Sequence, residues 1–309
     1  MGFSVAAAAL LTANKDLFRG KKILSLGNPF GAEISFKKYL KASQINKIGE
    51  QPRDMRARYL FTEIFQADDF KILDISAEEG ADYVADLNHP ITQDELKEAF
   101  QIVLDLGTQE HVFNDMTFLK NVFDILSSDG TYLFDLPANN YCEHGFRQFS
   151  PTFFYDLCAS NHSWLKISHL SLYSSGIYLN TLPLYEKLDP NFCEIAKIAT
   201  INMPPKMISS GIFTGTSIAL FNKVNCPTGV IGVITQSNDS SQELNLAAIQ
   251  ALYRKLPLSS ILPNAQPIQS LMQQFKQSSI GAAKKVLTNL PARLTIRILG
   301  IVARKFTKR

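Results

Sequence analysis

Two histidines and a glutamate are the residues of this chain best suited to moving a proton. Glu110 and His111 follow the apolar run 100–106, and His144 lies in a polar and aromatic loop further along. Because an imidazole titrates near neutral pH, either histidine could accept the proton of a hydroxyl group as a general base. The alternative is structural: His111 would cap or pack the next helix, and His144 would anchor its loop. We predict Glu110, His111 and His144 as catalytic residues.

The same residues raise the question of a metal site. Glu110, His111, Glu143 and His144 all carry side chains that can bind metal ions. Adjacent residues of one loop rarely direct both side chains at a single ion, so we expect no metal. The four cysteines stand far apart and form no C-x-x-C pair, which also argues against a zinc site or a disulfide framework.

Short apolar runs alternate with helical patterns in the first half of the chain, where they would position these side chains. The predicted strands are 22–27, 70–75, 82–86, 100–106 and 131–136, and the predicted helices are 33–42, 55–65, 93–99, 117–126 and about 151–160. Such alternation implies a parallel sheet with right-handed crossovers. The expected fold is α/β, a Rossmann-like, mostly parallel sheet with helices on both faces. Ligands of such sheets bind beyond the carboxyl ends of the strands.

The pattern changes after the fifth strand. Runs 164–173 and 216–224 predict late strands, which could form an antiparallel hairpin at the sheet edge. The polar stretch 236–242 is the best linker candidate. We therefore predict a domain over residues 1–235 and a basic helical extension over residues 243–309.

Several predicted strand ends carry short sequence motifs, and the order of these motifs along the chain is distinctive. The segments are Ile23-Leu-Ser-Leu-Gly27, Leu73-Asp-Ile-Ser76, Asp86-Leu-Asn-His-Pro-Ile91, Gly107-Thr-Gln-Glu-His-Val-Phe-Asn114 and His144-Gly-Phe-Arg-Gln-Phe-Ser-Pro151. In this order they resemble a family of bacterial class I S-adenosylmethionine-dependent methyltransferase-like proteins. The resemblance covers about residues 20–165, and its last two segments are the most distinctive.

The resemblance implies a pocket for S-adenosylmethionine at the strand ends. The implied cofactor contacts are Gly27, Gly31, Asp74, Asp86, Leu87, Asp105 and Gly107. The first two glycines would bring backbone close to the methionine moiety, and the aspartate after the second strand would bind the ribose hydroxyls. Asp86 and Leu87, after the third strand, would face the adenine. Asp105 and Gly107, after the fourth strand, would lie near the transferred methyl group. Each also has a structural reading, as a turn glycine or a capping aspartate.

The loop that holds His144 would shape the acceptor side. Tyr141, Phe146, Arg147 and Phe149 would line the acceptor pocket, with Arg147 a candidate contact for an anionic group. The acceptor would be a small molecule, a saccharide or a lipid-linked compound.

One departure from the family pattern keeps a second function open. Class I methyltransferases usually show an acidic residue and then G-x-G-x-G at the first strand, whereas Ser25 and Pro29 stand here. These two residues favour a catalytically silent scaffold of the same fold, while Asp74, Asp86 and Asp105 favour a methyltransferase. An enzyme that uses a nucleotide sugar or NAD is a weaker third hypothesis, because the glycine pattern for a pyrophosphate is missing.

Charge divides the chain into an acidic body and a basic tail. From Gln242 onward there are 11 lysines and arginines and a single acid, Glu243, although the whole chain has a net charge of only +3. Residues 291–308 predict an amphipathic basic helix, suited to an anionic membrane surface or to packing on the body or a second subunit. We do not expect nucleic acid as a partner, because few aromatic residues interleave the charges. The expected compartment is the cytoplasm, with peripheral membrane association through residues 291–309.

Overall fold

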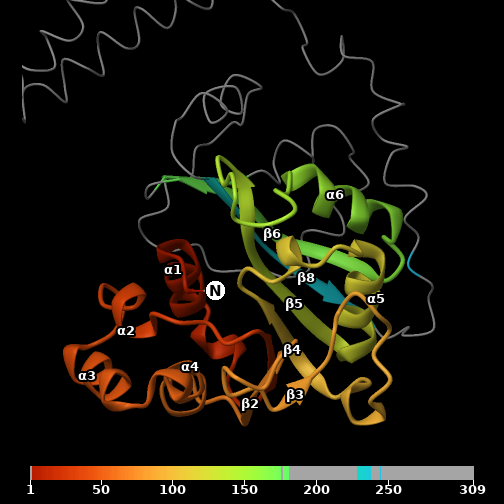
Figure 1. Cartoon of the computed structure of the whole chain (residues 1–309). Coiled ribbons are helices and arrows are strands. Elements are labelled where there is room, and N and C mark those ends of the chain that lie inside the picture. The colour runs from red at the N-terminus through yellow and green to blue at the C-terminus, as the bar shows by residue number, and fades with distance from the viewer. Residues whose placement is uncertain (1, 175–176, 181–227, 238–243, 245–309) are drawn as a thin grey trace, which may run out of the picture. The chain divides into compact units, whose positions relative to one another are not determined.

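The computed structural model describes residues 2–174, 177–180, 228–237 and 244, which contain one mixed β-sheet (Figure 1). Its strand order is β3-β2-β1-β4-β5-β8-β6-β7. The strands are β1 (Lys22–Leu26), β2 (Asp69–Asp74), β3 (Tyr83–Val84), β4 (Phe100–Asp105), β5 (Leu126–Asn139), β6 (Leu165–Ser174), β7 (Ile177–Asn180) and β8 (Thr228–Gln236). Strands β1 to β5 pair in parallel, whereas β8 runs antiparallel to both β5 and β6. The predicted Rossmann-like, mostly parallel sheet is confirmed.

Helices cover both faces of this sheet (Figure 1). One face carries α1 (Val5–Ala13), α2 (Ala32–Ser35), α3 (Ala42–Glu50) and α4 (Arg56–Tyr59), and the other carries α5 (Asp115–Ile125) and α6 (Pro151–Ser160). Successive strand residues point to opposite faces, so Ile102 and Leu104 of β4 pack with the first group and Val103 packs with the second. The two resulting cores fix the carboxyl ends of β1, β2 and β4 beside one another.

Two predicted helices are shorter in the structure than the sequence pattern suggested. The pattern at 93–99 yields one 3₁₀ turn, η4 (Asp94–Leu96), because Glu98 takes a positive φ of 51° and the chain then enters β4. The pattern at 33–42 yields only the four residues of α2, and a separate helix, α3, begins at Ala42. The helical prediction at 55–65 corresponds to α4 and a π-helical turn, η3 (Leu60–Ile64).

Strand β8 was not predicted from the sequence. Its glycines at 229 and 232 weaken the strand pattern, yet they make room for aromatic rings. A Cβ atom would lie 2.2 Å from Tyr173 Cζ at the first position and 2.3 Å from Phe134 Cζ at the second. The predicted strand at 216–224, most of the linker and the basic tail lie outside the described residues, so the domain boundary stays a prediction. Among the described residues, no helix has the length and apolar character that a bilayer crossing requires.

Helix α6 contains a buried acid, and we predict that Asp156→Asn stabilises the protein at alkaline pH. Asp156 is 3% exposed, its Oδ1 has no hydrogen-bond partner among the described residues, and burial raises its pKa to about 6. A raised folded pKa contributes stability at acid pH that is lost as the pH rises through about 6. Urea unfolding should therefore show a gain of about 1–2 kcal/mol for the variant at pH 8 and no gain near pH 4.

The exposed Asp124→Asn change provides the control, since that carboxylate only pairs with Lys120 on the surface of α5. Destabilisation of Asp156→Asn at pH 8 would contradict the prediction and indicate a partner for the ionised carboxylate.

Candidate functional site

The loop after β1 is tightly tied to its neighbours through Asn28. Gly27 and Gly31 both have positive φ angles, of 77° and 79°, and the Gly27 amide donates to Leu73 O at 2.7 Å. Asn28 is fully buried, and its Nδ2 donates to Asp54 O and to Glu79 O, each at 2.9 Å. Its Oδ1 has no hydrogen-bond partner among the described residues. One strong acceptor at the end of β1 therefore remains available.

Ser25, where the family pattern has an acid, turns inward. Its hydroxyl donates to Gly27 O at 2.7 Å and the residue is 1% exposed. This bond stabilises the turn and leaves the serine hydroxyl without a role toward a ligand. Sequence reasoning missed Asn28 beside it, although a polar residue directly after a strand-end glycine was a usable signal.

The carboxyl end of β2 combines an acid with an exposed apolar surface. Asp74 is partly buried, and one of its carboxylate oxygens accepts the Ser76 amide at 3.3 Å. Asp74 pairs with Val84 of β3 across the ladder. Ile75 and Val84 are 69% and 49% exposed. This strand end therefore offers an acid and exposed apolar side chains to a ligand.

The predicted residues after β3 take structural positions. Asp86 is exposed and accepts the Asn88 backbone amide at 2.9 Å and the Asn88 side-chain amide at 2.8 Å. These hydrogen bonds lower the pKa of Asp86. Leu87 is 5% exposed and belongs to the core on the α5 side of the sheet. Asp86 thus forms a turn with its own neighbour, and Leu87 presents almost no surface.

Asp105, at the end of β4, is a fully buried cap. Its Oδ1 accepts the amides of Gly107, Thr108 and Gln109, and its Oδ2 accepts the Tyr132 hydroxyl at 2.9 Å. Burial raises its pKa to about 6, against the effect of these hydrogen bonds. Gly107 follows with a positive φ of 108°. Both residues shape the loop that leads into the 3₁₀ turn η5 (Gln109–His111).

The three predicted catalytic residues come together at this loop. We call Glu110, His111 and His144 the Glu110 cluster. His144 Nε2 lies 3.5 Å from Glu110 Oε1, and His111 Nε2 lies 3.9 Å from the same oxygen. The two imidazole ring centroids are 5.5 Å apart. One residue of the cluster comes from the loop after β5, so the fold unites side chains that are distant in sequence.

The carboxyl group of Glu110 is buried and poorly satisfied. The residue is 1% exposed, and neither carboxylate oxygen has a hydrogen-bond partner among the described residues. Burial, followed by the charges of Asp105 and Asp135, raises the pKa of Glu110 to about 8. Burial, followed by the charge of His144, lowers the pKa of His111. Both shifts favour the uncharged form of the side chain.

The loop that carries His144 is clamped by hydrogen bonds onto the backbone of Glu110 and of the residues that follow it. The Phe146 amide donates to Glu110 O at 2.7 Å. Arg147 donates to Val112 O and Phe113 O and also pairs with Asp115 at 2.7 Å. All of these contacts are within the chain, so Arg147 helps to hold the loop in place. Its geometry gives no support to the anion-binding role that we considered from the sequence.

Exposed aromatic residues stand beside the Glu110 cluster. Phe113 and Phe146 are 72% and 69% exposed, and their ring centroids are 6.0 Å apart in an edge-to-face arrangement. Met116 is 50% exposed in the first turn of α5. Tyr141 lies with its ring centroid 5.4 Å from that of His144. By contrast, Phe149 is 3% exposed and belongs to the core.

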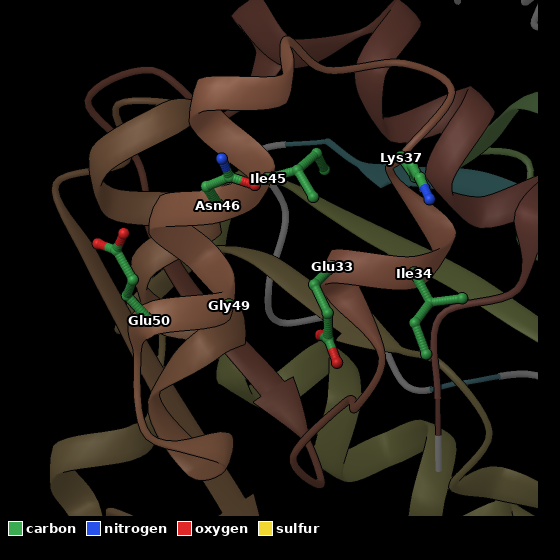
Figure 2. A pocket seen from close by; sticks show the side chains of 7 residues that line it. All are labelled: Glu33, Ile34, Lys37, Ile45, Asn46, Gly49 and Glu50. Atoms are coloured by element: carbon green, nitrogen blue, oxygen red, sulfur yellow. The ribbon is translucent and has the colours of Figure 1, made fainter.

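A surface hollow lies between α2 and α3, which do not contribute to the Glu110 cluster. The side chains that line this hollow do not point toward one another. Figure 2 shows that its labelled side chains, including Glu33, Lys37 and Glu50, point in different directions. Glu33 also pairs with Arg56 at 2.6 Å, so its charge is already compensated. The Glu110 cluster and the ends of β1 and β2 remain the stronger candidate site.

Comparisons with known proteins give distant structural likenesses only. No family model and no curated protein matches the sequence. A 1,6-didemethyltoxoflavin N1-methyltransferase from Burkholderia thailandensis, solved with S-adenosylhomocysteine, is 10% identical over 76% of this chain and 79% of its own, with a TM-score of 0.38. An S-adenosylmethionine-dependent methyltransferase from Mesorhizobium loti is 12% identical over 75% and 98%, with a TM-score of 0.37. A polyketide-synthase O-methyltransferase from Brevibacillus brevis is 11% identical over 84% and 81%, with a TM-score of 0.38.

Proposed function

We propose that this chain is an S-adenosylmethionine-dependent methyltransferase whose acceptor is a small molecule with a hydroxyl group. The observation that carries the proposal is the Glu110 cluster, which lies directly beyond the carboxyl end of β4 in a Rossmann-like sheet. Ligand sites of such sheets lie at that edge. The strand-end motifs at residues 23–27, 73–76 and 86–91, which lie outside the cluster, add support from the sequence.

The ends of β1 and β2 offer groups that fit the cofactor. Asn28 Oδ1, buried and without a hydrogen bond among the described residues, suits the ammonium group of the methionine moiety. Asp74 keeps one carboxylate oxygen for the ribose hydroxyls, and the exposed Ile75 suits the adenine ring. When bound, S-adenosylmethionine supplies a methyl group on a positively charged sulfur. Leu87 adds little to this fit because it is 5% exposed, whereas Asp86 is exposed and, like Asp74, accepts a turn amide through Oδ1.

The Glu110 cluster suits the acceptor side. Methyl transfer to a hydroxyl requires a group that takes the hydroxyl proton, and a half-exposed imidazole of His111 or His144 can do so. The exposed rings of Phe113 and Phe146 suit an apolar portion of the acceptor. An acceptor with an aromatic or lipid portion fits this rim better than a purely polar saccharide.

Cofactor binding is the direct test, and we predict that it depends on Asp74. Isothermal titration of the full chain with S-adenosylhomocysteine should give one site, and Asp74→Ala should weaken binding about 100-fold or more. The reason is the loss of charge-assisted hydrogen bonds to two ribose hydroxyls, each contributing about 1.5 kcal/mol or more.

The matched control is Asp69→Ala, at the opposite end of the same strand, which should bind like the parent chain. No heat with the parent chain at high concentration would contradict the proposal. That result would favour the catalytically silent scaffold. The supporting observation is that the Ser25 hydroxyl already donates its hydrogen bond to Gly27 O.

A further inference from the structure

Glu110, His111 and His144 form a cluster with the composition and spacing of a metal site. One ligand atom from each side chain can be chosen so that all three lie within 4.8 Å of one another. Two atoms that each lie ~2.1 Å from a tetrahedral zinc ion are ~3.4 Å apart. The Nε2 atoms of His144 and His111 lie 3.5 Å and 3.9 Å from Glu110 Oε1, which is close to that spacing.

The buried carboxylate is a second, independent indication. Glu110 is 1% exposed, and both of its oxygens are without a hydrogen bond among the described residues. A buried carboxyl group without partners is costly to the fold, and such groups are normally paired or bound to a metal. A cation between the three side chains would satisfy this carboxylate. Both imidazoles are about half exposed, so an ion can reach them from solvent.

The local backbone explains how adjacent residues can share one ion. The sequence argument against a metal was that Glu110 and His111 would point apart. The 3₁₀ turn η5 instead places His111 Nε2 3.9 Å from Glu110 Oε1. The clamp of Phe146 on Glu110 O then holds His144 over the same carboxylate. Glu143, the fourth residue considered, is exposed and does not belong to the cluster.

We propose that the Glu110 cluster binds one divalent first-row transition-metal ion, Zn²⁺ being the best match to two imidazoles and a carboxylate. Three protein ligands leave at least one coordination position open, which is the arrangement of catalytic zinc sites. A hydroxyl bound there would lose its proton more readily. Metal binding itself does not depend on the methyltransferase proposal.

The test measures metal binding by the full-length chain. After dialysis against a chelator, titration with Zn²⁺ should show one site per chain, and Co²⁺ should give the visible absorption of a tetrahedral N/O site. Glu110→Gln and the double change His111→Ala with His144→Ala should each lower Zn²⁺ affinity by about 100-fold or more. His89→Ala is the matched control, because His89 is 79% exposed and lies outside the cluster.

Circular dichroism of each variant separates a lost site from a lost fold. Glu110→Gln removes a buried unpaired acid, so we expect this variant to fold at least as well as the parent chain. Zn²⁺ binding that survives both sets of changes would overturn the proposal and point to cysteine ligands elsewhere. Absence of Zn²⁺ and Co²⁺ binding by the folded parent chain would overturn it as well.

Discussion

Asp105→Ala is expected to lower the free energy of unfolding by about 3 kcal/mol, as measured by urea denaturation at neutral pH. The change removes the acceptor of three backbone amides and of the Tyr132 hydroxyl. Tyr132 is fully buried, so water cannot replace the lost partner there. Each buried donor left unpaired costs about 1–3 kcal/mol, partly offset by removal of a carboxyl group that resists ionisation in the core.

Two further variants separate the contributions. Asp105→Asn keeps a side-chain oxygen for the amides and should lose only about 1 kcal/mol. Tyr132→Phe removes the hydroxyl that donates to Asp105 Oδ2 at 2.9 Å and to Gln109 Oε1 at 3.4 Å, and the loss of stability should likewise stay near 1 kcal/mol. Equal stability of Asp105→Ala and the parent chain would contradict the capping role and would return Asp105 to the group of candidate ligand contacts.

The sequence predicted the parallel part of the sheet because its signals are local. Each of β1, β2, β4 and β5 contains a short run of buried, mostly apolar residues, as expected for strands covered on both faces. Strand β8 escaped prediction because its contribution is non-local. Its glycines at 229 and 232 accommodate rings from β6 and β5, and nothing in the segment itself indicates those rings. The β-branched residues of β8 favour a strand, and only its two glycines weaken that local pattern.

Residue types at strand ends indicated where chemistry could occur, but not which side chains would be free. Asp74, Asp86 and Asp105 look alike in the sequence, since each is an aspartate at the carboxyl end of a predicted strand. In the structure Asp105 uses both carboxylate oxygens in hydrogen bonds, whereas Asp74 and Asp86 each accept hydrogen bonds from the described residues through Oδ1 alone. These differences arise from neighbours along the loop and across the sheet. The meeting of Glu110 with His144 could be proposed from topology, because the loops after adjacent parallel strands lie at one edge.

Gly145→Ala is expected to separate His144 from Glu110, and it tests whether the clamp creates the site. A Cβ atom at this position would lie 2.8 Å from Glu110 Cγ and 3.0 Å from Glu110 O, and the second of these is a backbone atom that cannot rotate away. Relief of the clash requires the loop to move outward by several tenths of an ångström, which would break the 2.7 Å bond from the Phe146 amide to Glu110 O. Overpacking of this kind costs about 1–2 kcal/mol of folding free energy.

Two measurements report on the displaced loop, and they do not depend on each other. Hydrogen exchange should show loss of protection at the Phe146 amide, whatever the cluster binds. Affinity for Zn²⁺ should fall about 10-fold or more, because metal ligands must keep their spacing within a few tenths of an ångström. Gly49→Ala in α3 is the matched control: apart from its own helix backbone, no atom of the described residues lies within 4 Å of its added Cβ, so neither measurement should change. If the hydrogen exchange rate of the Phe146 amide is unchanged in Gly145→Ala, Glu110 has moved and the loop has not. The clamp would then not be what holds His144 in place.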